Sequence, residues 1–107
     1  MADRADQLVL IVEDEPLVRW SLATRLRNDG YSAEALETGE EALAFFEERR
    51  ADLIVLDVNL TSMTGLDVLE ALRARGHDGL PAIIITAYED EALAEACRKL
   101  GVFAIMG

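Results

Sequence analysis

Residues 53–60 read LIVLDVNL, an apolar run that carries one aspartate, Asp57, near its end. The run is short enough for a strand, and its lack of polar alternation predicts burial on both faces of a sheet. A charged side chain beside such a run is costly unless something there requires it. Asp57 therefore marks either a functional site or a turn of the chain.

Similar apolar runs recur on both sides of this stretch and alternate with segments of helical periodicity. A continuous apolar strand followed by a helix, repeated along the chain, predicts a parallel sheet packed between helices, and so the α/β class. The site of such a sheet lies at the carboxyl ends of its strands. We expect strands at 8–12, 32–36, 53–56, 82–86 and 102–106, and helices at 17–26, from 38 to about 49, from 66 to about 76, and at 90–100.

Local signals mark the ends of these helices. Pro16 fits the first turn of the first helix. Thr38 and Glu41 have the spacing of a capping box at the start of the second. Asp90 is a candidate N-cap of the fourth helix, and Gly101 is its expected C-terminal stop.

The length and composition suit one domain, which we assign to residues 1–107. Hydrophobic residues make up 51% of the chain, and its net charge is −11. That charge, without a basic stripe, argues against direct binding to nucleic acid or anionic lipid. No apolar run is long enough to span a membrane, and the N-terminal MADRADQ lacks an export signal. Cys97 is the only cysteine, which fits a cytoplasmic location.

Three carboxylates and one hydroxyl fall at the ends of neighbouring strands. Glu13 and Asp14 follow the first strand, Asp57 ends the third and Thr86 ends the fourth. Each has an ordinary explanation as a helix-terminal acid, a turn residue or a strand former. Together they predict one pocket, where crowded carboxylates repel unless a cation lies among them. Oxygen ligands supplemented by water suit Mg²⁺.

The segments around these residues resemble the receiver domains of two-component response regulators, over essentially the whole chain. LVLIVEDEP (8–16) resembles the first strand with its acidic pair. DLIVLDVNLTSMTGLDVLEALR (52–73) resembles the phosphoacceptor strand and the following helix, and AIIITAY (82–88) the fourth strand with its Thr-Ala switch. The resemblance implies a flavodoxin-like, doubly wound, five-stranded sheet in the order 2-1-3-4-5.

The resemblance also implies roles at the site. Asp57 would accept a phosphoryl group from a histidine kinase or a phosphotransfer protein. Asp14 and Asp57 would bind Mg²⁺ directly, Glu13 through water and Asn59 through its backbone carbonyl. The domain would be a signalling phosphoacceptor rather than an enzyme, assisting its own Mg²⁺-dependent phosphorylation and dephosphorylation.

The same resemblance assigns a conformational switch. Thr86 would hydrogen-bond a phosphoryl oxygen, and Ala87 would leave room for it. Tyr88 and Ile105 would belong to the surface that changes, and the two-state shift would control an output.

The sequence departs from the family pattern in four ways. No proline stands in the stretch 60–62, where most members have one, which predicts a looser loop. Ile105 occupies the aromatic switch position. The family's lysine would fall one residue past Gly107, and the only lysine, Lys99, lies in the fourth helix. The fifth helix is missing too, so we interpret the domain as C-terminally truncated and expect self-association through the uncovered sheet face, or marginal stability.

Three other functions could explain Asp57 and its surroundings. A calcium-binding loop starting at Asp57 would need glycine in place of Ser62 and glutamate in place of Val68. A phosphatase with an aspartyl nucleophile would need a second aspartate where Asn59 stands. A pseudo-receiver, an interaction module that does not accept phosphate, stays open because the lysine is absent.

One further resemblance concerns the first helix. EPLVRWSLATRL (15–26) looks like the first helix of receivers in NtrC-type transcription activators. The remainder of such a protein would carry an ATPase and a DNA-binding domain. Trp20 carries part of this resemblance, although a tryptophan on an amphipathic helix is more often a packing residue.

Overall fold

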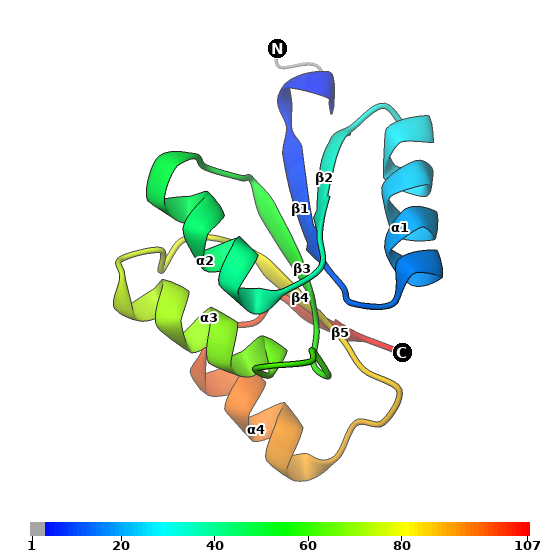
Figure 1. The fold of residues 1–107 in the computed structure, drawn as a ribbon. Helices are drawn as coiled ribbons and strands as arrows, with labels where there is room; N and C mark the ends of the chain where they lie inside the picture. Colours follow the sequence, from blue (N-terminus) through cyan, green and yellow to red (C-terminus); the bar gives the residue numbers. More distant parts are fainter. Residues whose placement is uncertain (1–3) are drawn as a thin grey trace.

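Five strands pair in parallel in the order β2-β1-β3-β4-β5 in the computed structural model, which describes residues 4–107 (Figure 1). This arrangement confirms the predicted α/β class and strand order. The strands are β1 (Leu8–Val12), β2 (Ser32–Leu36), β3 (Leu53–Asp57), β4 (Ala82–Ile85) and β5 (Ala104–Met106). The helices are α1 (Pro16–Asn28), α2 (Gly39–Glu48), α3 (Gly65–Ala74) and α4 (Glu91–Lys99), preceded by a short 3₁₀ turn, η1 (Arg4–Asp6).

The strand register decides which loops meet. β1 lies between β2 and β3, with Val12 paired to Leu36 on one side and to Leu56 on the other. The chain therefore leaves β1 and β3 in adjacent loops at the point where the strand order reverses, which is where α/β sheets place their sites. Next to β3, Asp57 pairs with Ile85 of β4.

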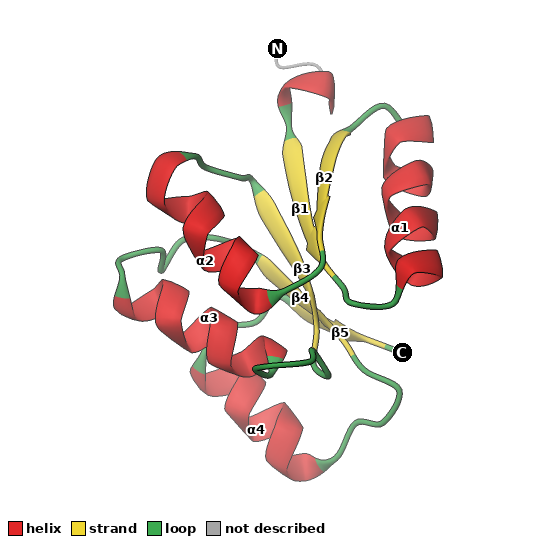
Figure 2. Cartoon of the chain, viewed as in Figure 1, coloured by secondary structure: helices red, strands yellow, loops and turns green. Residues whose placement is uncertain are grey.

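The two faces of the sheet are covered unequally. α2, α3 and α4 cover one face, whereas α1 alone covers the other (Figures 1 and 2). The larger core cluster lies under the three helices and includes the fully buried Leu10, Leu56 and Ile84. On the α1 side the buried residues are fewer, and they centre on Ile11 and Val55. Most of the apolar burial that stabilises the fold is therefore on one side.

Burial on both faces was predicted for every continuous apolar strand, and that prediction is wrong for β4 and for β5, where Met106 is 55% exposed. Along β4, Ala82 and Ile84 are buried while Ile83 and Ile85 are only partly covered. Within residues 4–107, α1 is the only helix on this face of the sheet. The open face forms an apolar cleft of about 390 Å³ lined by, among others, Val18, Leu22, Val55, Ile83, Ile85 and Met106.

Helix α1 also differs from its predicted packing. Val18, Leu22 and Leu26, which recur at helical spacing, are only partly covered, and Ala23 is the helix's one buried residue. Trp20 is 66% exposed, so the packing role favoured for it is wrong in this structure. Val18, Leu22 and Leu26 line the open cleft beside α1, so one side of this stripe has no protein partner among the described residues.

The helix starts follow the sequence signals. Thr38 and Glu41 form the predicted capping box of α2, and Asp90 caps α4 through the amide of the residue three positions on. A second capping box, between Thr64 and Asp67, begins α3 and was not predicted. Each box satisfies amide groups that a helix leaves without partners in its first turn.

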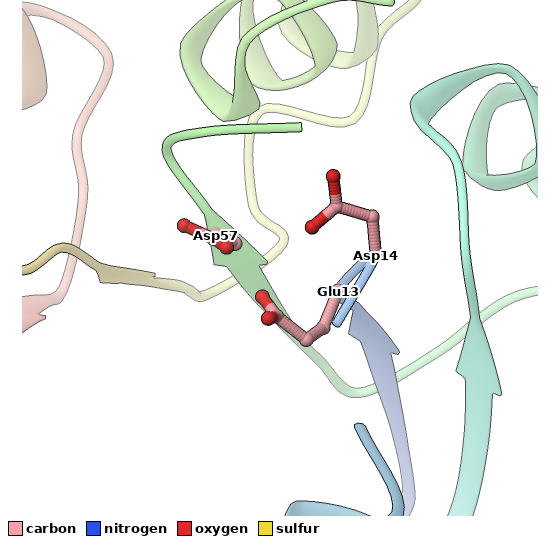
Figure 3. A group of neighbouring side chains, drawn as sticks. All are labelled: Glu13, Asp14 and Asp57. Atoms are coloured by element: carbon pink, nitrogen blue, oxygen red, sulfur yellow. The ribbon is translucent and has the colours of Figure 1, made fainter. Parts of the chain in front are cut away.

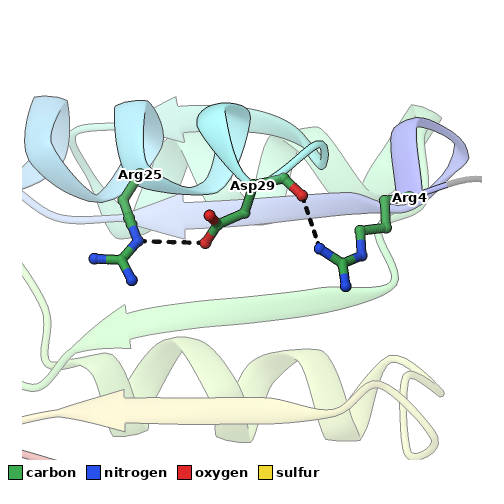
Figure 4. A network of polar contacts seen from close by, with 3 residues as sticks. All are labelled: Arg4, Arg25 and Asp29. Carbon is green, nitrogen blue, oxygen red and sulfur yellow. Dashed lines mark hydrogen bonds and ion pairs between the residues drawn. The ribbon is translucent and has the colours of Figure 1, made fainter.

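The C-terminal end of α1 is tied to the start of the described chain (Figure 4). Arg4 donates to the backbone carbonyl of Asp29 at 3.0 Å, and Arg25 pairs with the Asp29 carboxylate at 3.3 Å. Both side chains of the ion pair are largely exposed, so the pair contributes little to stability. Within residues 4–107, no helix has the length and apolarity needed to cross a membrane.

Arg73 links the C-terminal ends of two helices. Its half-buried guanidinium donates to the carbonyls of His77, Leu80 and Leu100 at 2.6, 2.7 and 2.9 Å. Gly101, with a φ of 68°, ends α4 as predicted, and its carbonyl lies 3.5 Å from the same guanidinium. A positive charge is favourable at helix C-termini, where backbone carbonyls lack partners.

We therefore expect Arg73→Met to lower the free energy of unfolding by about 2 kcal/mol or more, since hydrogen bonds from a charged group contribute about 1.5–3 kcal/mol. Urea denaturation followed by circular dichroism measures the change. Arg75→Met is the control, because Arg75 is exposed and its pair with Glu47 is 3.9 Å long. The control should change stability by less than about 0.5 kcal/mol. Equal losses in the two variants would contradict this role for Arg73.

Candidate functional site

Three acidic side chains meet at the carboxyl edge of the sheet (Figure 3). Glu13 and Asp14 directly follow β1, and Asp57 is the last residue of β3. One carboxylate oxygen from each residue lies within 4.8 Å of the other two. The predicted meeting of these three side chains is thereby confirmed, and it follows from the pairing of β1 with β3.

Glu13 is the most buried member of the cluster, with 4% of its surface exposed. Its Oε2 atom is buried and has no hydrogen-bond partner within the described part of the chain. Burial is the main cause that raises the pKa of Glu13 from 4.5 to about 8, and the Asp57 carboxylate is the next. Asp14 adds to this shift in pKa, while a backbone hydrogen bond with Glu15 opposes it.

The backbone of Glu13 is fixed on both sides. Its amide donates to the carbonyl of Leu36 on β2 at 3.0 Å. Its carbonyl accepts a hydrogen bond from the Arg19 guanidinium at 2.9 Å. Sequence analysis did not find this role of Arg19, because a single arginine on a helix has no signature of what it contacts.

Asp57 is held by the loop that follows it. The amide of Asn59 donates to Asp57 Oδ1 at 3.0 Å, and the amide of Val58 donates to the carbonyl of Ile85 at 3.0 Å. Gly65 packs directly against the Asp57 backbone, where an added Cβ would lie 2.3 Å from the Asp57 carbonyl oxygen. Only glycine allows α3 to begin this close to the aspartate.

The loop after β3 contacts two other elements. Thr61 Oγ1 donates to Asp14 Oδ2 at 2.8 Å. Ser62 Oγ lies 2.6 and 2.7 Å from the two carboxylate oxygens of Glu40 on α2. This contact with Ser62 lowers the pKa of Glu40. These two hydroxyls give the loop contacts that its lack of proline did not suggest, and its looseness stays a prediction.

The end of β4 completes this edge of the sheet. Thr86 is buried, and its hydroxyl donates to the carbonyl of Tyr88 at 2.9 Å and accepts from the Tyr88 amide at 3.2 Å. Ala87 is exposed and Tyr88 is 76% exposed. Ile105 is partly buried against the larger core cluster. Lys99 lies in the last turn of α4, which ends near the opposite edge of the sheet (Figure 1).

The donor set fits a hard divalent cation. Glu13, Asp14 and Asp57 offer carboxylate oxygens, the ligand type that Mg²⁺ prefers, and Mg²⁺ keeps several waters when only a few carboxylates bind it. The unpartnered Oε2 of Glu13 is a buried acceptor that a metal-bound water would satisfy. A cation would also relieve the repulsion among the three carboxylates.

A family model described as the response regulator receiver domain matches residues 9–106. The chain belongs to this family. Residues of this receiver domain are 45% identical over 83 positions to the sensory transduction protein RegX3 of Mycolicibacterium smegmatis, covering 78% of the chain and 36% of that protein. The two-component response regulator PhoP of Pseudomonas aeruginosa is 43% identical over 79 residues, covering 74% and 35%. The receiver domain thus spans about one third of the length of these relatives.

Solved receiver structures have the same fold. A response regulator receiver protein from Pseudomonas putida superimposes with a TM-score of 0.89 at 27% identity, covering 99% of this chain and 88% of that one. The response regulator TrrA from Thermotoga maritima, solved in complex with Mg²⁺ and BeF, gives 0.82 at 30% identity, covering 94% and 84%. Receiver domains are signalling phosphoacceptors rather than classical enzymes, and they bind Mg²⁺ at an acidic pocket.

The pKa of Glu13 has a consequence for stability. Because the pKa in the folded protein, about 8, lies above the ordinary 4.5, the folded state keeps a proton that the unfolded state has lost between these values. This contribution is full below about pH 4.5 and is lost as the pH rises to 8. In EDTA, we expect the free energy of unfolding to fall over this range more steeply in the wild type than in Glu13→Gln.

Urea denaturation at pH 5, 6.5 and 8 measures the difference between the two proteins. Glu48→Gln changes an exposed glutamate at the far end of α2 and should retain the wild-type pH dependence. Parallel pH profiles for the wild type and Glu13→Gln would show that Glu13 does not titrate in this way.

Proposed function

We propose that this receiver domain takes a phosphoryl group onto Asp57, in the cytoplasm, from the phosphohistidine of a histidine kinase or a phosphotransfer protein. The observation that carries the proposal is the meeting of three carboxylates, one with a buried, unpartnered oxygen, where the strand order reverses. Membership of the receiver family supports the same assignment.

For phosphoryl transfer, the protein has mainly to position the reacting groups and to neutralise their negative charge. A carboxylate oxygen of Asp57 forms a bond to phosphorus while the bond from phosphorus to the imidazole nitrogen breaks, and that nitrogen keeps the electron pair. A carboxylate needs no proton removed before it attacks. Bound Mg²⁺ would offset the repulsion between the carboxylate and the phosphoryl oxygens. The same arrangement would let the domain assist its own phosphorylation and dephosphorylation.

Each cluster residue has a distinct task in this proposal. Asp14 and Asp57 would bind Mg²⁺ directly, and Asn59 would contribute its backbone carbonyl. Glu13, whose side chain is the most deeply buried, would act through a water molecule. The hydrogen bond from the Asn59 amide to Asp57 Oδ1 keeps the acceptor carboxylate in a defined orientation for attack.

The phosphoryl group would compete for the hydroxyl of Thr86. That hydroxyl now bonds to the backbone of Tyr88, so a turn toward new phosphoryl oxygens would release the loop after β4. Ala87 would leave room for the group, while Tyr88 and Ile105 would change the surface near α4 and β5. The output that this shift controls, including the NtrC-type output suggested by α1, stays a prediction.

A partner would have to approach Asp57 from solvent. The surface beside Asp57 carries exposed apolar side chains that a protein partner could cover. Helix α1 begins two residues after the acidic pair, and its first two turns expose Leu17 at 74% and Trp20 at 66%. Exposed large apolar side chains next to a site mark a surface that another protein covers. We therefore place part of the kinase contact on the start of α1.

The direct test is phosphorylation by acetyl phosphate with and without Mg²⁺, followed by intact-protein mass spectrometry. We expect one phosphoryl group in the wild type with Mg²⁺, and none in Asp57→Ala. The matched control is Asp78→Ala, which removes an exposed aspartate from the loop after α3. Equal labelling of wild type and Asp57→Ala would exclude Asp57 as the acceptor. No labelling of the wild type would favour a pseudo-receiver.

We also propose that this chain self-associates through the apolar cleft beside α1. The cleft is lined by residues of four strands and of α1, and solvent contact with this apolar surface is unfavourable. A second copy would cover the same face in a symmetric dimer. Within residues 4–107, no element covers the cleft.

Sedimentation velocity over a range of concentrations tests this association. Val18→Glu puts a charge into the cleft and should shift the chain from dimer to monomer. Leu17→Glu is the matched control, because Leu17 neighbours Val18 on α1 but does not line the cleft. A wild type that is monomeric at every concentration and has a high melting temperature would contradict the proposal.

A further inference from the structure

The loop after β3 carries a hydroxyl in the stretch where most receiver domains have a proline. Thr61 Oγ1 donates to Asp14 Oδ2 at 2.8 Å, across 47 positions of sequence. Proline has no donor that could make this bond. The contact therefore joins the loop that starts at the proposed phosphoacceptor to one of the proposed metal ligands.

We propose that Thr61 is a positioning residue for Asp14, which orients its carboxylate for Mg²⁺ before the ion binds. This inference rests on the proposed function, because it assumes that Asp14 is a metal ligand. The hydroxyl holds one carboxylate oxygen and leaves the other without a protein donor among the described residues. A carboxylate has about four acceptor positions, so one hydrogen bond does not exhaust it.

The physical basis is pre-organisation. Asp14 is partly exposed and lies in the loop after β1, where its side chain would otherwise sample several rotamers. Threonine is branched at Cβ and stiff about χ1, which makes its hydroxyl a well-placed donor. If a ligand side chain has to be immobilised when the ion binds, the affinity of the site for the ion is typically a few- to tenfold lower. Removal of the hydroxyl should therefore weaken Mg²⁺ binding by about 3- to 10-fold.

The neighbouring Ser62 provides a matched comparison. It belongs to the same loop and also donates to a carboxylate, but that carboxylate is Glu40 on α2, outside the acidic cluster. A general loosening of the loop would follow from the loss of either hydroxyl. A specific effect on Asp14 would follow only from the loss of the Thr61 hydroxyl.

Isothermal titration calorimetry with MgCl₂ on the metal-free chain separates these effects. Thr61→Val keeps the shape and removes the hydroxyl, and we expect its dissociation constant to rise by about 3- to 10-fold. Thr61→Ser restores the donor and should return to within about twofold of wild type. Ser62→Ala should bind as the wild type does. Urea denaturation in EDTA shows whether either loss of a hydroxyl lowers stability without changing the affinity.

The outcomes distinguish this inference from the function on which it rests. Mg²⁺ binding by Thr61→Val that is as tight as in the wild type, or tighter, would overturn the positioning role while leaving the metal site intact. Tighter binding would mean that the hydroxyl competes with the ion. Equal weakening by Ser62→Ala would also overturn the role, because the effect would be one of loop order. Absence of Mg²⁺ binding in the wild type, or binding unchanged in Asp14→Ala, would overturn the metal site itself.

Discussion

The repulsion among the carboxylates of Glu13, Asp14 and Asp57 is the constraint that the rest of this structure accommodates. Three acids within 4.8 Å, one of them almost fully buried, disfavour the folded state unless a proton or a cation reduces their charge. The pairing of β1 with β3 nevertheless holds the three residues together, because both strands bury apolar side chains in the core and that burial stabilises their pairing. The site is thus built to gain from an ion.

Residues of α1, α3 and the loop after β3 hold the cluster in place. Arg19 on α1 holds the backbone of Glu13, while the amide of Asn59 orients Asp57. Gly65 lets α3 start against the Asp57 carbonyl, and Thr61 reaches across to Asp14. These contacts surround the acids with fixed groups, so that binding of an ion requires little reorganisation. The open cleft of the sheet is separate from this cluster, because none of the three acids lines it.

Much of the fold could be predicted from local pattern. The apolar runs located β1, β3, β4 and β5, the capping box at Thr38 and Glu41 marked the start of α2, and the positions of the acids followed from the rule that sites lie at carboxyl strand ends. The missing fifth helix led us to expect an uncovered part of the sheet, but the apolar run of β4 could not indicate that Ile83 and Ile85 are the residues left half-covered. An apolar run indicates that a strand can be buried but not whether a helix covers it. The exposure of Trp20 escaped prediction for the same reason.

The sequence by itself determined the order of elements, the class of fold, the family resemblance and the meeting of three acids, since these depend on periodicity and on residue types at strand ends. Only the tertiary structure decided that Thr61 bonds to Asp14, that the Thr86 hydroxyl is engaged by Tyr88, and which residues line the open part of the sheet. The physical reason is the separation along the chain over which each signal acts. Periodicity reports the surroundings of a few neighbouring residues, whereas a hydrogen bond across 47 positions depends on how the whole chain packs.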